Sequence, residues 1–156
     1  MQTVEYQCLE GQPSAEVIGW ITTMNQEIFS FGETAVVLSG FFSRQQNPLV
    51  CIASITGRPI GFKIGFEESP SCFESWRGGV VERERRQGVA KELMRLQHLW
   101  CKEKGYKVIK TTTNNDNVPM LVLNMQSGFL ITGSFMNRRK RLKLLQEKWL
   151  ASSSPV

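Results

Sequence analysis

An arginine-rich loop in the middle of the chain leads directly into a segment with helical periodicity. Gly78-Gly79 ends an extended apolar stretch, and the run from Arg85 to Lys91 (RRQGVAK) then carries the spacing R-x-x-G-x-A. The first turn of a helix presents unpaired backbone N–H groups and a partial positive charge. Glycine at such a turn lets the backbone approach an anion closely. The loop therefore predicts a site for a diphosphate, held mainly by main-chain donors.

Other ligand-binding patterns fit the sequence less well. A nucleotide-binding G-x-x-x-x-G-K-[ST] loop is absent, because Gly57 and Gly61 are wrongly spaced before Lys63, and there is no G-x-G-x-x-G. The four cysteines form no C-x-x-C pair and the chain has one histidine, so we expect no metal site. The diphosphate loop is thus the strongest chemical signal in the chain.

Periodicity and turn residues predict a single α/β domain over residues 1–150, with a frayed end at 151–156. The 156 residues suffice for one core, and their 41% hydrophobic and 21% charged content excludes a disordered chain. The order β-α-α-β-β-β-α-β-α-β-β favours a mixed sheet with helices on both faces. The strands are expected at 3–9, 49–55, 59–66, 72–81, 106–113, 128–135 and 140–149, and the helices at 16–29, 33–44, 88–104 and 118–126.

The helix expected at 88–104 is amphipathic. Its apolar face carries Val89, Leu93, Leu96 and Trp100, and its opposite face carries Lys91, Arg95, His98 and Lys102. We therefore expect the only histidine to lie among solvated basic residues, without a catalytic role.

Two stretches resemble the GNAT N-acetyltransferases. The run GGVVERERRQGVAKELM is similar to that family's strand, loop, R/Q-x-x-G-x-G/A and helix. Asn117, followed eleven residues later by Gly128-Phe129, resembles the family's asparagine, helix and Gly-Phe ending. Together they cover about residues 72–135, so the chain is identified as a small single-domain member of bacterial type. The resemblance implies a twisted, mostly antiparallel sheet of about seven strands.

The resemblance further implies acetyl-CoA as the acyl donor. A bulge at Gly78-Gly79 would splay a pair of parallel strands, and a backbone N–H near Val80 would stabilise the oxyanion. Main-chain groups near Val80, Val81 and Glu82 would bind the pantetheine arm. The pyrophosphate would lie on the loop and the first helical turn, and Asn117 would contact the cofactor further along. The expected loop residues are Arg85, Arg86, Gln87, Gly88, Val89, Ala90 and Lys91.

Catalytic groups are less well marked. Glu74 lies six residues before Val80, the spacing of the glutamate base in histone-acetylating members of the superfamily, and Glu33 is the alternative. The family's general acid, a tyrosine four residues before the Gly-Phe pair, is replaced by Asn124. Asparagine can hydrogen-bond a sulfur but supplies no proton, so protonation of the leaving thiolate has no assigned residue. Aromatic residues that could line an acceptor pocket are Phe29, Phe31, Phe41 and Phe42.

The expected reaction is acetyl transfer to a primary amine, by direct attack in a ternary complex. The acceptor is a small molecule or a peptide amine, and the alternative is a catalytically weak acyl-CoA-binding or sensing module. Nucleic acid is not expected, because the basic run 138–143 lacks interleaved aromatic residues. No apolar run is long enough for a membrane span, and no export signal is visible, which predicts a cytoplasmic protein. We expect a monomer or a homodimer.

Overall fold

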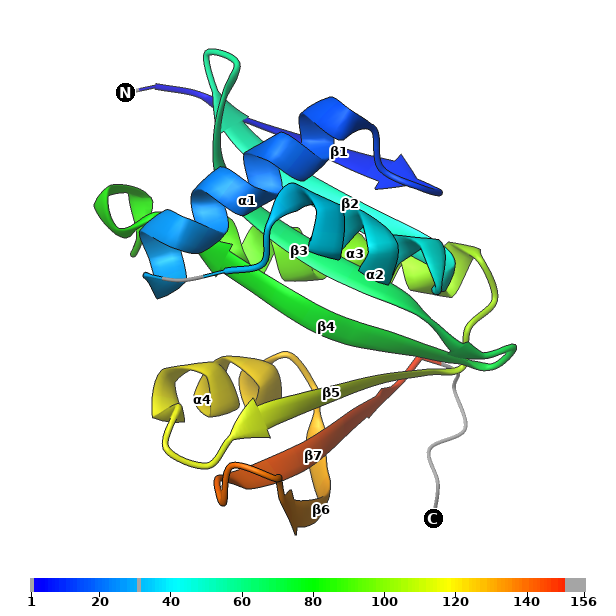
Figure 1. Ribbon diagram of the computed structural model, residues 1–156. Helices are drawn as coiled ribbons and strands as arrows, with labels where there is room; N and C mark the ends of the chain where they lie inside the picture. The colour runs from blue at the N-terminus through cyan, green and yellow to red at the C-terminus, as the bar shows by residue number, and fades with distance from the viewer. Residues whose placement is uncertain (1, 31, 151–156) are drawn as a thin grey trace.

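A computed structural model describes residues 2–30 and 32–150 (Figure 1). The frayed end expected at 151–156 lies outside these described residues, as does Phe31. The elements are β1 (Val4–Glu10), α1 (Ala15–Phe29), α2 (Ala35–Ser43), β2 (Gln46–Ile55), β3 (Arg58–Ser69), β4 (Cys72–Val80), η1 (Glu82–Glu84), α3 (Val89–Glu103), β5 (Val108–Asn114), α4 (Val118–Gln126), β6 (Leu130–Met136) and β7 (Leu142–Trp149).

The strands form one sheet in the order β1-β2-β3-β4-β5-β7-β6. Every neighbouring pair is antiparallel except β4 and β5, which run parallel. Helix α1 packs on β3 and β4, and Figure 1 shows α1 and α2 in front of the sheet with α3 behind it. The expected element order and the mixed, mostly antiparallel sheet are confirmed. No helix among the described residues has the length and apolarity to cross a membrane.

Polar side chains begin three of the helices. The Ser14 hydroxyl accepts a hydrogen bond from Val17 N at 3.3 Å, and Thr34 does the same for α2. The Asn117 amide oxygen accepts from Met120 N at 3.4 Å at the start of α4. Each of these bonds satisfies one of the N–H groups that a helix leaves unpaired in its first turn. They explain why the helix boundaries lie close to those expected from the sequence.

Three segments differ from the expectation. β3 continues to Ser69, three residues beyond its expected end at residue 66. The short 3₁₀ helix η1 follows β4, where only a loop was expected. The basic residues 138–141 form the turn between β6 and β7, where Asn137 Oδ1 accepts from Arg141 N at 2.9 Å, so the last strand begins two residues later than expected.

The expectation for His98 is wrong. Its side chain is only 6% exposed, and its ring packs on Phe129 at a centroid distance of 5.4 Å. Lys148 Nζ on β7 lies 3.0 Å from His98 Nδ1. Phe129, which follows α4, and strand β7 therefore cover a segment of α3 that helical periodicity assigned to solvent. Burial lowers the pKa of His98 to about 3.

Close packing between strands makes Gly65 a sensitive position. A Cβ atom there would overlap the Phe73 ring and lie 2.7 Å from Glu74 O. We expect Gly65→Ala to lower the free energy of unfolding by about 2 kcal/mol, because a methyl group must be forced into a packed core. Gly19→Ala is the control, because a Cβ at that helical position meets nothing within 4 Å, and it should stabilise by about 0.5 kcal/mol. Urea denaturation of both variants measures the difference, and equal stabilities would contradict the prediction.

Candidate functional site

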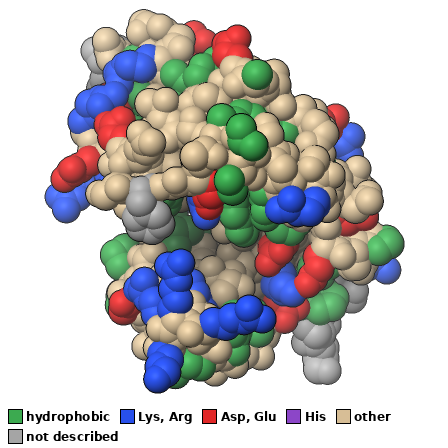
Figure 2. All heavy atoms as spheres, viewed as in Figure 1, with side chains coloured by type: hydrophobic (Ala, Val, Ile, Leu, Met, Phe, Trp, Pro, Cys, Tyr) green, Lys and Arg blue, Asp and Glu red, His purple; other side chains and the backbone are tan. Residues whose placement is uncertain are grey.

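Strands β4 and β5 separate along their length. They pair only from Cys72↔Val108 to Ser75↔Thr111, and beyond this point neither strand is the other's partner. A cavity of about 210 Å³ lies there, and Figure 2 shows a hollow in this region with Lys and Arg side chains along its lower side. The expected separation of the parallel strands is confirmed. The cavity is lined by Phe62, Lys63, Ser75, Trp76, Arg77, Gly78, Gly79, Val80, Ala90, Leu93, Thr111, Thr112, Thr113, Asn114, Asn117, Met120 and Lys143.

The bulge in β4 is at Trp76, so its expected location at Gly78-Gly79 is wrong. Across β3, Arg77 pairs with Ile64 while Ser75 pairs with Gly65, which leaves Trp76 as the extra residue. Both glycines pair regularly, and their lack of a side chain relieves crowding instead. A Cβ at Gly78 would lie 3.0 Å from Phe62 O, and one at Gly79 would lie 3.0 Å from Ile28 Cδ1.

The end of β4 turns main-chain groups toward the cavity. Val81 N donates to Ile60 O on β3 at 2.9 Å. Because successive residues of an antiparallel ladder alternate between paired and unpaired positions, the N–H groups of Val80 and Gly78 face away from β3, toward β5. The Val80 carbonyl accepts from Arg85 Nε at 2.9 Å. Val80 therefore offers a free N–H, whereas the N–H of Val81, also expected to bind the cofactor, is already paired.

The first turn of α3 has unpaired donors at the mouth of the cavity. Gly88 is the N-cap, with a φ of 80° and no capping side chain. The first backbone hydrogen bond of the helix runs from Glu92 N to the Gly88 carbonyl, at 3.0 Å. Within the described residues, the N–H groups of Val89, Ala90 and Lys91 donate to no acceptor. This arrangement fits a phosphate group, which binds such donors together with the positive end of the helix dipole.

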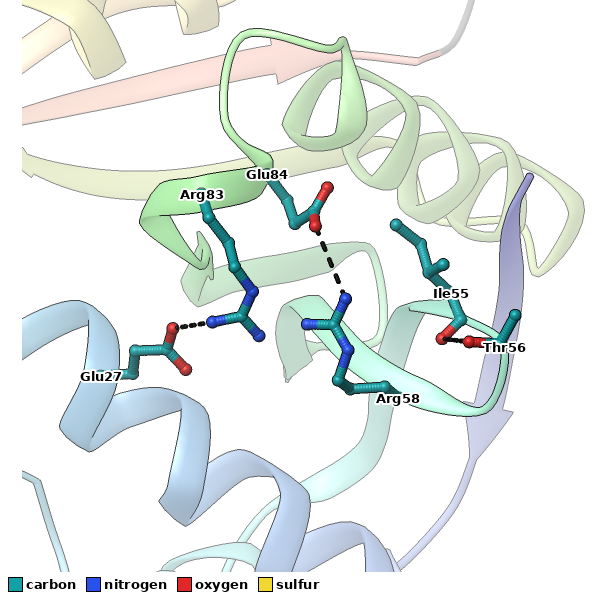
Figure 3. Close-up of polar contacts among 6 residues, drawn as sticks. All are labelled: Glu27, Ile55, Thr56, Arg58, Arg83 and Glu84. Carbon is teal, nitrogen blue, oxygen red and sulfur yellow. Dashed lines mark hydrogen bonds and ion pairs between the residues drawn. The ribbon is translucent and has the colours of Figure 1, made fainter. Parts of the chain in front are cut away.

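Two ion pairs fix the loop before α3 (Figure 3). Arg83 Nη1 lies 2.7 Å from Glu27 Oε1 on α1, and Arg58 Nη2 lies 3.6 Å from Glu84 Oε1. These contacts hold η1 against α1 and against the turn between β2 and β3. The start of the loop is thereby anchored to two elements before the chain enters α3.

The remaining expected cofactor residues lie around this turn. Arg86 and Lys91 are exposed, and among the described residues neither has an ion-pair partner. Gln87 and Glu82 are also exposed, and the Glu82 carbonyl accepts from the backbone N–H of residue 85. Asn117 lines the cavity from the start of α4. The free cations Arg86 and Lys91 are therefore those best placed to meet a phosphate.

The two candidate bases differ in their electrostatics. Glu74 is half-buried, lies opposite Phe66 and Lys110, and is not among the residues that line the cavity. Burial raises the pKa of its carboxyl, against the opposing effect of Lys110. Glu33 accepts two hydrogen bonds from Arg77, at 2.8 and 3.0 Å, and these lower its pKa. Glu33 is therefore the weaker base of the two at neutral pH.

Asn124 lies in the interior, behind the cavity wall. Its side chain is 2% exposed, and Nδ2 donates to Gln146 Oε1 at 2.8 Å and to Thr113 Oγ1 at 3.3 Å. Thr113 lines the cavity, whereas Asn124 does not. The residue at the family's usual acid position thus holds Thr113 in place, and its amide is already engaged.

Aromatic side chains border the cavity on the α2 side of the sheet. The Phe41 ring stacks on Trp76 at a centroid distance of 4.1 Å and meets Phe66 edge-on at 5.7 Å. Phe29 is 37% exposed, beside Gly79. Phe42 is 1% exposed within the core, so its expected place in an acceptor pocket is wrong.

Lys63, to which sequence patterns assigned no role, is the most unusual side chain of the cavity. It is 8% exposed, and among the described residues it has neither a hydrogen bond nor an ion pair. Burial lowers its pKa to about 8. A charged residue inside the apolar strand PIGFKIGF was the available signal, but only the pairing of the strands shows that it reaches a cavity.

Comparison with protein families gives one match. Residues 14–129 match the model described as the acetyltransferase (GNAT) family. A search of curated protein sequences found no match.

Solved structures of the same fold are numerous. The ribosomal-protein-S18-alanine N-acetyltransferase of Escherichia coli superposes with a TM-score of 0.78 at 10% identity, over 95% of this chain and 97% of that one. Ard1 from Thermoplasma volcanium gives 0.76 at 18% identity, over 93% and 99%. A GNAT family acetyltransferase from Elizabethkingia anophelis with acetyl-CoA bound gives 0.68 at 16% identity, over 93% and 98%.

Proposed function

The chain belongs to the GNAT acetyltransferase family, and on that premise we propose that it transfers an acetyl group from acetyl-CoA to a primary amine by direct attack in a ternary complex. The observation that carries the proposal is the separation of β4 from β5 beside the unpaired amides of α3. When bound, acetyl-CoA supplies the acetyl group as a thioester. The amides of Val89, Ala90 and Lys91 would hold its diphosphate, and the N–H groups of Val80 and Gly78 would hold the extended arm.

Glu74 is the general base of the proposal. An alkylamine has a pKa near ~10 and must lose a proton before it attacks. A carboxyl whose pKa is raised by burial, as that of Glu74 is, accepts a proton more readily at neutral pH. Its strand neighbour Phe66 belongs to the aromatic group with Phe41 and Trp76, which would border the acceptor.

A panel of amines tests the activity. Release of free CoA is measured with polyamines, free lysine and peptides with an unblocked N-terminus. Peptides beginning with alanine come first, because the Escherichia coli neighbour is named for an alanine of a ribosomal protein. Binding of acetyl-CoA without turnover of any amine would favour the alternative, a cofactor-binding or sensing module.

A charge at Ala90 tests the phosphate site. We expect Ala90→Asp to weaken acetyl-CoA binding at least about 30-fold, because a carboxylate in the first turn of α3 would repel the diphosphate and occupy the helix dipole. An acidic residue favours a first helical turn, so the fold should remain intact. Isothermal titration measures the affinity, with Ala90→Asn as the uncharged control of the same size as aspartate. Unchanged affinity in Ala90→Asp would place the diphosphate elsewhere.

A further inference from the structure

Lys63 reaches the cavity from β3, through a space that a neighbouring glycine leaves open. Its register partner on β4 is Gly78, where a Cβ atom would lie 3.3 Å from Lys63 Cγ. Lys63 shares the lining of the cavity with Ser75 and Thr111, the last pair before the strands separate. Among the described residues no carboxylate forms an ion pair with this buried ammonium group, which is unusual, since buried charges are normally paired.

Few groups that line the cavity can release a proton. The lining residues include no carboxyl, histidine, tyrosine or cysteine, and the ionisable ones are Lys63, Arg77 and Lys143. Arginine side chains do not release a proton in proteins, and the guanidinium of Arg77 is bonded to Glu33. Lys143 pairs with Asn114 at the far end of β5, where the strands have separated. Lys63 is therefore the one acid among the lining residues near the closed end.

A cofactor anchored by its diphosphate at α3 would extend along Val80 and Gly78 toward the point where β4 and β5 meet. Its thioester would then lie near the register position of Lys63. We propose that Lys63 Nζ is the general acid of the acetyl transfer, an assignment that rests on the proposed function. As the amine nitrogen bonds to the acetyl carbon and the carbon–sulfur bond breaks, Lys63 Nζ gives its proton to the sulfur. Lys63 then takes up a proton from water. The base releases to water the proton that it took from the attacking amine, so the protons balance.

The electrostatics around Lys63 suit this role. The Cys51 thiol lies opposite Lys63 on β2, and neutral His98 lies near it on α3. Arg77 from β4 and Lys143 from β7 are the other cations that line the cavity. The lining residues of β5 and α4 add no charge. The pKa of Lys63, lowered by burial to about 8, lies close to the ~8.5 of a thiol, so the proton moves between groups of nearly equal basicity.

The test compares Lys63→Met, Lys63→Arg and wild type, with two readouts. The first is the ionisation of the thiol of bound CoA, followed by thiolate absorbance against pH. An ammonium beside the sulfur should hold the thiol pKa at least about one unit lower in wild type and in Lys63→Arg than in Lys63→Met. Lys102→Met, which removes an exposed charge on α3, is the control and should leave the thiol pKa at its wild-type value.

The second readout is turnover with the best amine of the panel. Both substitutions should lower kcat about 100-fold, because arginine keeps the charge but releases no proton. The fall of wild-type kcat above pH 8, where Lys63 loses its proton, should disappear in both. An unchanged thiol pKa in Lys63→Met, or an unchanged kcat profile, overturns the assignment. If wild type binds CoA but acetylates no amine, the proposed function fails, while the thiol ionisation still decides whether Lys63 faces the sulfur.

Discussion

Lys63→Met is expected to raise the free energy of unfolding of the ligand-free protein by about 3 kcal/mol at pH 7. Burial lowers the pKa of Lys63 from 10.5 to about 8, so charging it costs more in the folded state than in the unfolded chain. The difference of about 2.5 pH units, at about 1.4 kcal/mol each, gives the expected gain. Methionine fills a similar volume without a charge.

The pH dependence identifies the cause of this effect. Between pH 8 and 10.5 the unfolded chain binds more protons at residue 63 than the folded one, so wild-type stability rises with pH in this window. The free-energy cost of burying the charged Lys63 is fully present below pH 8. The difference in free energy of unfolding between Lys63→Met and wild type should therefore fall to about 1 kcal/mol at pH 10. Urea unfolding at pH 7 and pH 10 measures both values. Lys102→Met should lie within about 0.5 kcal/mol of wild type at each pH. A Lys63→Met variant no more stable than wild type at pH 7 would mean that the ammonium is stabilised within the fold.

A stability cost of this size is informative because no ion pair among the described residues compensates for it. Proteins tolerate strained or destabilising groups mainly at functional sites. Lys63 lies in the cavity between the separated strands, and burial of its charge becomes favourable only beside an anion or a group that becomes one. Its expected effects on stability and on catalysis therefore have opposite signs.

Local signals explain what could be predicted before the structure was known. The start of α3 and the bounds of α4 follow from single turns and caps: α3, expected from Gly88, begins at Val89 with Gly88 as its N-cap, and α4 has the expected bounds. Such features depend on a few neighbouring residues. The order of the strands follows from the same kind of signal, because each strand is bounded by its own turn residues.

Features set by pairing between distant strands could not be predicted. The bulge at Trp76 depends on how β4 pairs with Ile64 and Gly65 of β3, which periodicity within β4 does not contain. The exposure of Lys63 to a cavity depends on how far β4 and β5 pair before they separate. The sequence predicted a bulge at Gly78 and Gly79, whereas these positions need glycine because a Cβ atom would contact β3 or α1. Tertiary contacts therefore decide the chemistry at the closed end of the cavity.

Burial of His98 has a consequence for acid stability. The protein should lose about 2 kcal/mol of stability between pH 6.5 and pH 5, and about 4 kcal/mol by pH 3 from this residue alone. Burial lowers the pKa of His98 from 6.5 to about 3, and a protonated ring would also face the Lys148 ammonium, 3.0 Å from Nδ1. Lys63 adds a second positive charge nearby. In this window the unfolded chain binds more protons, so stability present above pH 6.5 is lost as the pH falls.

His98→Gln should remove most of this slope, because a glutamine oxygen can accept the hydrogen bond from Lys148 and does not titrate. Urea unfolding of both proteins at pH 7, 6 and 5 gives the comparison, in a range where most carboxylates remain ionised. Below pH 6, the free energy of unfolding of wild type should fall by about 1.4 kcal/mol more per pH unit than that of the variant. Parallel curves would mean that His98 takes up its proton as easily in the folded protein as in the unfolded chain. A solvated histidine, as helical periodicity alone predicted, would give that result, so the slope distinguishes the two placements of the residue in solution.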